Sequence, residues 1–567
     1  MTNIQPSLLE PPPVAEPGTN GTGKKRGKSA PTLTTTQQLG SLIKSARDTM
    51  RKDKGPGMDT DLGRLPLLTW VMFLKFLDDI DTIRAEEAIL SGEPFRPTLD
   101  APYRWSDWAG DPQGITGDDL LSFINDREID DPLRREDKQG KTLRVPGLFA
   151  YLRGLQDAAH GSSRRDVVSK VFQELACPMR SGYLLREVIN KVSGIHFTSQ
   201  EELFTLGTLY ESLLKEMRDA AGQNGEFYTP RAVVRFMVTV IHPCLGETVL
   251  DPACGTGGFL VEAYRHLERQ CQTVEDRETL QSGSLFGGEA KPLPYLLSQM
   301  NLLLHGLEAP QIDPGNSLRF ALTDIRDRDR VDVILANPPF GGEEEKGIQN
   351  NFPNDKRTGE TALLFLQLIM RKLRRPGSPS SPSSLTPPSL TGKGDGGLGS
   401  YGRAAVVVPN GTLFGDGVCA RIKEQLLTEF NLHTIVRLPN GVFAPYTGIP
   451  SNLLFFDRSG PTEHVWYYEQ PLPEGRKNYT KTAPLQFEEF ADCLAWWEHR
   501  EENDRAWRVP ASEILANGCN LDRKNPRAAA DLAHLPPEEL VASVLAKEER
   551  IVEILAEIKA ALAGAGA

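Results

Sequence analysis

Cysteine is scarce in this sequence of 567 residues, and its few occurrences follow no metal-binding spacing. The seven cysteines are scattered, odd in number and without C-x-x-C pairs, which argues against a disulfide scaffold and indicates no metal site. No secretory segment opens the chain, and no apolar run reaches the roughly 20 residues that a membrane span requires. We therefore expect a cytoplasmic protein that holds no metal and does not cross a membrane.

Positive charge is in deficit as well, since 64 Lys and Arg residues stand against 76 Asp and Glu, for a formal net charge of −12. Contacts to nucleic-acid phosphates need Lys and Arg. For this chain to act on nucleic acid, its basic residues would therefore have to be clustered on one surface, or a partner would have to contact the phosphates. A Walker-type G-x-x-x-x-G-K-[ST] is also absent, so ATP-driven translocation is not expected of this chain.

The most informative motif present is the tetrapeptide Asn337, Pro338, Pro339, Phe340, which follows the apolar run 331–336. The run predicts a buried parallel strand, and ligands bind at the carboxyl ends of such strands. Two prolines remove two N–H donors, so the amide oxygen of Asn337 and nearby carbonyls become acceptors suited to an exocyclic amine. Phe340 offers a flat face to a planar base. Alone, the tetrapeptide fits an ordinary turn equally well.

A second motif lies about 80 residues upstream and has the order strand, glycine loop, helix. The predicted strand ends at Asp251, and Gly255 and Gly257 allow the backbone to approach a ligand closely before a helix begins near Phe259. The spacing is neither that of a P-loop nor that of the dinucleotide fingerprint. Asp251 therefore indicates a cationic or amine-bearing ligand.

Two further polar residues follow predicted strands. Glu289 comes after the run 284–288 and is placed to accept hydrogen bonds from ribose hydroxyls, although its distance from the glycine loop exceeds the usual roughly 20 residues. Asn316 follows a third short strand, where its side chain could bond an adenine edge. These residues predict a nucleoside-containing cofactor across the strand ends.

In this order the motifs D-P-A-C-G-T-G-G-F, Glu289, Asn316 and N-P-P-F resemble those of S-adenosylmethionine-dependent N6-adenine DNA methyltransferases. The segment E-F-Y-T-P-R at residues 226–231 resembles the cofactor-contacting segment of that class. With residues 402–411, 446–452 and 520–526, the whole is similar to the modification subunit of type I restriction-modification systems, most closely over residues 203–457.

The resemblance implies an α/β fold with a doubly wound, mostly parallel sheet, a helical N-terminal domain, a C-terminal helix and S-adenosylmethionine as cofactor. It implies that the catalytic residues are Asn337, Pro338, Pro339 and Phe340. It also implies the cofactor-binding set Glu226, Phe227, Tyr228, Thr229, Pro230, Arg231, Asp251, Ala253, Cys254, Gly255, Thr256, Gly257, Glu289 and Asn316. A flipped adenine would stack on Phe340, helped by Tyr228 or Phe227.

The chain divides into four predicted parts. Residues 1–32 form a disordered basic tail, and residues 33–195, with helical apolar periodicity, form a helical domain. The catalytic domain spans residues 196–470 and carries a disordered Ser/Pro/Gly insertion at about 376–401. Residues 471–567 form a C-terminal region that ends in an amphipathic helix.

The expected partners follow from what this chain lacks. The roughly 100 residues after Gln470 are too few and too acidic for a target-reading domain, so readout of DNA bases is assigned to a separate specificity subunit. The resemblance adds double-stranded DNA, a restriction endonuclease subunit and two copies of this chain per complex. The amphipathic helix at 540–563 docks either on another subunit or within this chain.

Three alternatives stay open at this point. The chain could be an autonomous or solitary adenine DNA methyltransferase. It could methylate an amine of RNA or of a protein glutamine, because N-P-P-F/Y also occurs in such enzymes. Least favoured is a scaffold that keeps the fold without catalysis, since Asn337, Phe340 and Glu289 are intact.

Overall fold

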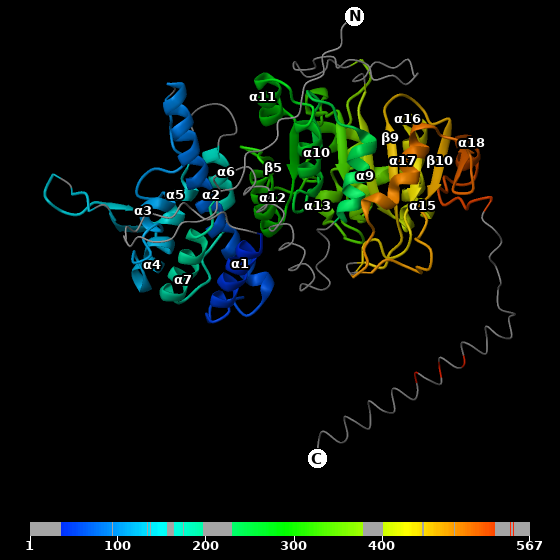
Figure 1. Ribbon diagram of the computed structural model, residues 1–567. Coiled ribbons are helices and arrows are strands. Elements are labelled where there is room, and N and C mark those ends of the chain that lie inside the picture. The colour runs from blue at the N-terminus through cyan, green and yellow to red at the C-terminus, as the bar shows by residue number, and fades with distance from the viewer. Residues whose placement is uncertain are drawn as a thin grey trace, which may run out of the picture.

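The computed structural model describes residues 36–527, apart from positions 93, 133, 137, 156–163, 174, 197–228, 378–400, 445–446 and 481, together with residues 545, 548 and 551 (Figure 1). Several predicted features lie outside the described residues: the basic tail, the sites Glu226, Phe227 and Tyr228, the Ser/Pro/Gly tract over 378–400, and nearly all of the predicted helix at 540–563.

The first part of the described chain is a helical body. Its helices are α1 (Thr36–Met50), α2 (Asp61–Ser91), α3 (Trp105–Trp108), α4 (Gly117–Asn125), α5 (Leu148–Arg153), α6 (Arg164–Phe172) and α7 (Gly182–Ser193). Its core is aromatic, and the ring of Trp70 lies 5.1 Å from Phe149 and 6.5 Å from Phe172, edge-on in both cases. The sequence did not predict the hairpin of β1 (Glu128–Asp130) and β2 (Arg144–Pro146), which projects from this body.

A nine-stranded sheet organises the rest, in the order β11-β10-β8-β9-β7-β6-β3-β4-β5. Its strands are β3 (Val249–Asp251), β4 (Leu285–Gly288), β5 (Gln311–Asp313), β6 (Val333–Ala336), β7 (Arg403–Pro409), β8 (Asn431–Arg437), β9 (Ser451–Asp457), β10 (His464–Glu469) and β11 (Ala506–Pro510). Strands β5, β4, β3, β6 and β7 pair in parallel, while β9 runs antiparallel between β7 and β8. The mostly parallel sheet confirms the predicted fold class.

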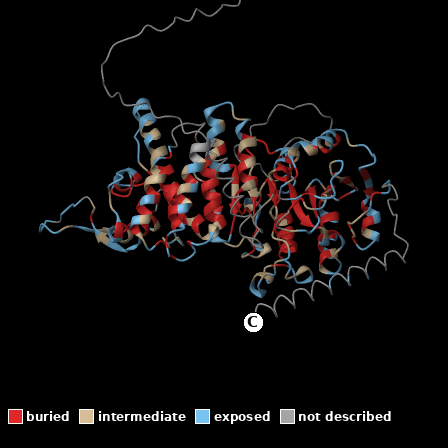
Figure 2. Cartoon of the chain, turned by 60° about the horizontal axis from the view of Figure 1, so that its bottom comes forward, coloured by how far each residue is buried: buried red, intermediate tan, exposed pale blue. Residues whose placement is uncertain are grey.

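Helices pack on both faces of this sheet (Figure 1). The helices of this part of the chain are α9 (Arg231–Ile241), α10 (Gly258–Glu268), α11 (Val274–Gly283), α12 (Pro292–Leu304), α13 (Lys346–Gln349), α14 (Thr361–Lys372), α15 (Asn410–Phe414), α16 (Val418–Glu429), α17 (Ala491–Glu498) and α18 (Ala511–Ala516). Alternate residues of β6 face opposite cores: Val333 and Leu335 join one hydrophobic cluster, and Ile334 and Ala336 join the other. Burial on both faces is what a doubly wound parallel sheet requires, and Figure 2 shows the resulting buried regions.

Helix α12 joins the helical body to the sheet. All of its residues from Pro294 to Leu304 are buried, because the helix contacts α10 on one side and α2 and α6 on the other. A polar cluster closes the junction: Arg84 pairs with the Glu308 carboxylate, and Nε of Arg164 donates to the Glu308 carbonyl at 3.3 Å. The helical body therefore lies beside the β5 edge of the sheet (Figure 1).

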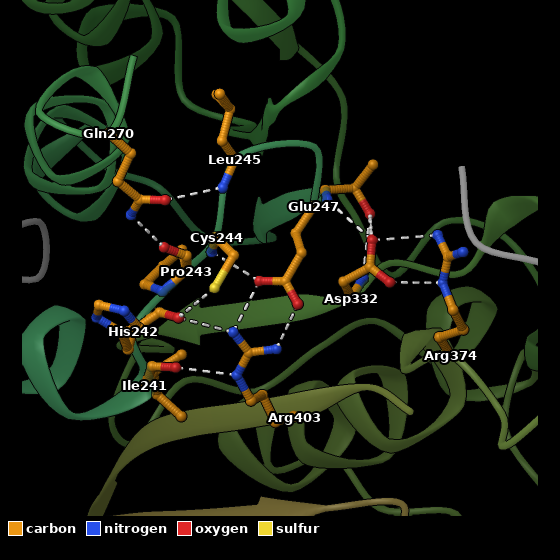
Figure 3. Close-up of polar contacts among 11 residues, drawn as sticks. Ile241, His242, Pro243, Cys244, Leu245, Glu247, Gln270, Asp332, Arg374 and Arg403 are labelled. Atoms are coloured by element: carbon orange, nitrogen blue, oxygen red, sulfur yellow. Dashed lines mark hydrogen bonds and ion pairs between the residues drawn. The ribbon is translucent and has the colours of Figure 1, made fainter. Parts of the chain in front are cut away.

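Two buried ion pairs fix the amino ends of the parallel strands (Figure 3). Arg403 holds Glu247 in a bidentate pair with two N–O distances of 2.7 Å, and its Nε donates to the Ile241 carbonyl at 2.9 Å. Asp332 accepts hydrogen bonds from the backbone N and Oγ1 of Thr248 and pairs with Nε of Arg374 at 2.7 Å. Burial lowers the pKa of Arg403, but Glu247 outweighs burial and leaves it raised.

Removing the carboxylate of Glu247 is expected to destabilise the sheet without touching the site. Glu247→Gln leaves the half-buried Arg403 without its charged partner, although the backbone carbonyls of Ile241 and His242 still accept. A cost of about 1–2 kcal/mol would lower the melting temperature by about 2–4 °C. The matched control is Asp492→Asn, which breaks the exposed pair with Arg505 and should change little. Equal melting shifts in the two variants would contradict this assignment.

The predicted Ser/Pro/Gly insertion begins and ends at one place. The backbone N of Arg374 donates to the Val331 carbonyl at 2.9 Å, and the N of Gly402 donates to the Arg374 carbonyl at 2.9 Å. The chain thus leaves α14 and enters β7 at hydrogen-bonded neighbours, which is where a short turn would otherwise connect them. Strands β6 and β7 pair in parallel from Val333 with Arg403 to Ala336 with Val406.

Candidate functional site

The polar residues that the sequence placed after strands gather at one edge of the sheet. Asp251 ends β3, Glu289 directly follows β4, Asn316 comes soon after β5, and Asn337 directly follows β6. These four strands are consecutive neighbours in the order β6-β3-β4-β5, and all of them run parallel. Their carboxyl ends therefore form a single row along which one extended ligand can lie.

The glycine loop is built to bring backbone close to such a ligand. Gly255 and Gly257 have φ of 54° and 78°, the left-handed region that glycine tolerates, and α10 starts immediately after Gly257. The backbone N of Gly255 donates to Glu289 Oε2 at 3.0 Å, and the N of Lys291 donates to Oε1 at 2.8 Å. A Cβ at Gly288 would lie 2.3 Å from the hydroxyl of Ser317 and 3.1 Å from the carbonyl oxygen of Pro252, so a larger residue there would displace one of them.

The loop is tied to the neighbouring strand and helix through its other residues. The N of Cys254 donates to the Gly288 carbonyl at 2.9 Å, and the N of Ala253 donates to Asp251 Oδ1 at 3.1 Å. The amide of Asn301, on α12, donates to the Thr256 carbonyl at 2.8 Å. The sequence analysis missed Asn301. The feature that could have indicated it is that Asn301 is a polar residue within the largely apolar sequence of α12.

Two carboxyl groups give the site its electrostatic character. Asp251 is 1% exposed, and burial, reinforced by the neighbouring Glu289 charge, raises its pKa to about 8. Burial also raises the pKa of Glu289, partly offset by the hydrogen bonds from Lys291 and Gly255. A cation bound at this edge would relieve both acids, so the donor set fits a positively charged ligand.

The tetrapeptide after β6 presents one acceptor and one aromatic face. Nδ2 of Asn337 donates to Thr229 Oγ1 at 2.9 Å, whereas Oδ1 of Asn337 is buried and has no hydrogen-bond partner among the described residues. Pro338 is buried and Pro339 half-buried. The ring of Phe340 is half-buried and lies 6.0 Å from Phe443, at an interplanar angle of 64°. A buried acceptor left open is costly unless a ligand completes it.

Phe443 is the second residue that the sequence analysis missed. It lies in the loop between β8 and β9, and the chain direction of β8 matches that of β7, since β9 is antiparallel to both. The loop therefore reaches the same edge as the tetrapeptide. The sequence around Phe443 does not distinguish it from a core phenylalanine, because its place at this edge is visible only from its contact with Phe340 in the folded chain.

Asn316 and the residues around the start of α9 already form hydrogen bonds within the chain. Oδ1 of Asn316 accepts from the backbone N of Leu318 at 2.9 Å, and its Nδ2 donates to Glu344 at 3.2 Å. To bond an adenine, Asn316 would exchange its link to Glu344. Pro230 precedes the first residue of α9, Arg231, whose Nη1 donates to the Gly258 carbonyl at 3.0 Å.

No helix among the described residues is long and apolar enough to cross a membrane. Within that same part of the chain, no group of three His, Cys, Asp or Glu residues is arranged to hold a metal.

The described site consists of a glycine loop, two buried acids, an open amide oxygen and the rings of Phe340 and Phe443. A mostly parallel sheet of this strand order, with a glycine loop after β3, has the architecture of S-adenosylmethionine-dependent methyltransferases.

Comparison with known proteins narrows the class. Residues 201–380 and 397–534 match the family model of N-6 DNA methylases. The chain is 44% identical over 539 residues to the EcoEI type I restriction enzyme methylase subunit of Escherichia coli, covering 93% of this chain and 99% of that protein. The chain therefore belongs to the N-6 DNA methylase family, with the methylase subunits of type I restriction enzymes.

Solved structures agree with this assignment. A crystal structure of the modification subunit of a putative type I restriction enzyme from Vibrio vulnificus YJ016 is 60% identical, with a TM-score of 0.78 over 89% of this chain and all of that one. A second structure, described for complex assembly and conformational transition of the type I R-M system, is 36% identical, with a TM-score of 0.70 over 93% of this chain and 98% of that one. The fold, the N6-adenine methylation activity and the cofactor follow from this membership.

The acidic site predicts how cofactor affinity depends on pH. Asp251 is protonated in the free protein below its pKa of about 8, and a sulfonium cation bound beside it would favour the ionised form. Binding must then release a proton, so affinity should rise by up to about tenfold per pH unit from pH 6 and level off near pH 8. Calorimetry in two buffers of different ionisation enthalpy measures the released proton. Asp251→Asn should flatten the profile, and an equally steep profile in that variant would contradict this explanation.

The raised pKa of Asp251 also makes the stability of the folded chain depend on pH. Because the pKa of Asp251 is raised on folding, its contribution to stability is complete below the unfolded value and is lost as pH rises through about 8. The free chain should accordingly melt at a lower temperature at pH 9 than at pH 6, and Asp251→Asn should reduce that difference.

Proposed function

We propose that methyl transfer in this chain is carried by the tetrapeptide after β6, with Asn337 as the acceptor for the target amine. The observation that supports this most is the buried Oδ1 of Asn337, which lacks a partner among the described residues. Oδ1 and the carbonyl of Pro338 would accept the two hydrogens of the adenine N6 amine. This draws the nitrogen toward a tetrahedral geometry, so that its lone pair points at the methyl group, and stabilises the positive charge that develops during transfer.

The remaining residues would hold the two reactants in line. The bound cofactor supplies a methyl group activated by its sulfonium. Asp251 and the backbone of the Ala253–Gly257 loop would position its cationic part, Glu289 its ribose hydroxyls, and Asn316 its adenine. Phe340, supported by Phe443, would stack the flipped target base. In-line alignment of this kind supplies much of the rate, and the amine proton leaves to solvent after transfer, so no strong base is needed.

Recognition of the DNA sequence is proposed to lie outside this chain. Residues 471–527 add β11 to the edge of the main sheet and place α17 and α18 on it, so the described residues after Gln470 are part of the catalytic body. The net charge of −12 also disfavours an independent grip on phosphates. We therefore assign target readout to a specificity subunit, in a complex that contains double-stranded DNA, a restriction endonuclease subunit and two copies of this chain. The 36% identical structure, described for complex assembly of the type I R-M system, supports assembly with partner subunits.

The experiment that tests this function offers the tritiated cofactor with three acceptors. Duplex DNA, structured RNA and a glutamine-containing protein are incubated with the chain and its specificity subunit, and the labelled base or residue is identified by mass spectrometry. The proposal requires label on N6 of adenine in DNA. It also requires that Asn337→Ala binds the cofactor but transfers little label. Label on RNA or protein, or full transfer by that variant, would contradict it.

A further inference from the structure

The side-chain amide of Asn337 is useful only in one of its two orientations. The terminal amide torsion of asparagine is broad and nearly two-fold, so the oxygen and the nitrogen can exchange places at little intrinsic cost. With Oδ1 toward the site, Asn337 accepts from the target amine. With Nδ2 there, it presents a donor to another donor. A hydroxyl on the opposite side of the amide can accept or donate, so it anchors the amide in place, and the incoming amine, which donates, favours the orientation with Oδ1 toward it.

Thr229 is the residue that bonds this opposite side. Its Oγ1 accepts the hydrogen bond from Asn337 Nδ2 at 2.9 Å, across 108 positions of sequence. Thr229 is itself held by its neighbours. The carbonyl of Pro230 accepts from the N of Val234 in the first turn of α9, and the guanidinium of Arg231 bonds the Gly258 carbonyl at the start of α10. The backbone next to Thr229 is thus tied to α9 and to the start of α10.

We propose that Thr229 is a positioning residue for methyl transfer: its hydroxyl anchors the Asn337 side chain beside the amine site and so orients the amide whose Oδ1 accepts there. This inference rests on the proposed role of Asn337. It differs from the sequence-based expectation, in which Thr229 contacts the cofactor. A cofactor contact contributes to cofactor affinity, whereas an orienting contact contributes only to the rate of the step in which the amide accepts.

The test compares Thr229→Val, which keeps the shape and removes the hydroxyl, with Thr229→Ser, which restores the hydroxyl. Each full chain is assembled with its specificity subunit and a target duplex, the single-turnover rate of methylation is measured, and cofactor affinity is determined by calorimetry. Thr229→Val should lower the rate by about tenfold, the effect of one hydrogen bond, and leave the cofactor Kd within about twofold. Thr229→Ser should recover the rate to within about threefold.

A double-variant cycle separates this role from a general effect on structure. If Thr229 acts only through Asn337, adding Thr229→Val to Asn337→Ala should cost nothing further, because no amide is left to orient. Thr229→Ala serves as a second variant without the β-branch and should behave like Thr229→Val. A tenfold loss that persists in the Asn337→Ala background, or a weakened cofactor Kd in chains that melt like the wild type, would overturn the inference.

Failure of the inference can be distinguished from failure of the proposed function. If Asn337→Ala alone methylates at the wild-type rate, the proposed function fails and the orienting role of Thr229 falls with it. If Asn337→Ala is impaired while Thr229→Val retains the full rate, only the role of Thr229 is wrong. The two variants therefore give independent readings in the same assay.

Discussion

Asn337→Ala is expected to lower the rate of methyl transfer by about 10²–10³-fold, the range seen when one donor or acceptor that serves the transition state is removed. The variant loses the buried Oδ1 that we assign to the target amine. Its cofactor affinity should stay within about twofold of the wild type, because no cofactor contact is assigned to Asn337. The effect should thus appear in the transfer step and not in cofactor binding.

The measurement is a single-turnover methylation of a target duplex, with labelled cofactor and the specificity subunit present. Asn517→Ala is the matched control, because Asn517 is an exposed asparagine at the end of α18. None of the residues assigned to catalysis or cofactor binding lies on that helix. It should retain the wild-type rate. A rate for Asn337→Ala within a few-fold of that control would remove the catalytic role of the tetrapeptide.

Glu289→Ala is expected to weaken cofactor binding by about 10-fold to 100-fold, from the loss of charged hydrogen bonds of about 1.5–3 kcal/mol. Glu289 also ties the glycine loop to the end of β4, since its two oxygens accept from the N of Gly255 and the N of Lys291. Removing it frees the glycine loop and deletes the proposed contact to the ribose. The loss should appear in the cofactor Kd, measured by calorimetry.

The same variant gives a second and more specific signal. The Glu289 charge contributes to the raised pKa of Asp251, so Glu289→Ala should move the pH at which cofactor affinity levels off to lower values. Glu268→Ala, at the far end of α10, is the control and should leave both affinity and profile unchanged. Unaltered affinity in a folded Glu289→Ala chain would show that Glu289 does not face the cofactor.

The parts of the fold that sequence reasoning predicted are those marked by local chemistry. Asp251, Glu289 and Asn337 each follow a short apolar run, and each run is a parallel strand that ends within a residue of the polar side chain. The antiparallel placement of β9 was not predicted, because an apolar run such as residues 451–457 reads the same in either direction when both faces are buried. The hairpin of β1 and β2 was missed because its residues are mostly exposed and charged.

The residues that were missed or reassigned depend on long-range pairing. Asn301 reaches the loop at Thr256, 45 positions away, and Phe443 meets Phe340 only because β8 and β6 end at the same edge of the sheet. The bond from Asn337 to Thr229 is likewise set by how α9 packs beside β6. Spacing along the chain carries no information on such contacts, since they arise from the order of strands in the sheet.

The central claim is that this chain transfers the methyl group while a separate subunit chooses the target. One measurement tests it directly: N6-methyladenine is mapped at single-base resolution on a long duplex after incubation with cofactor and the purified chain, with and without its specificity subunit. The account predicts sparse methylation without sequence preference from the chain alone, and methylation at a defined site, with a steep dependence on salt, when the subunit is added. Efficient methylation at a defined site by the chain alone would contradict the account and would favour an autonomous adenine methyltransferase.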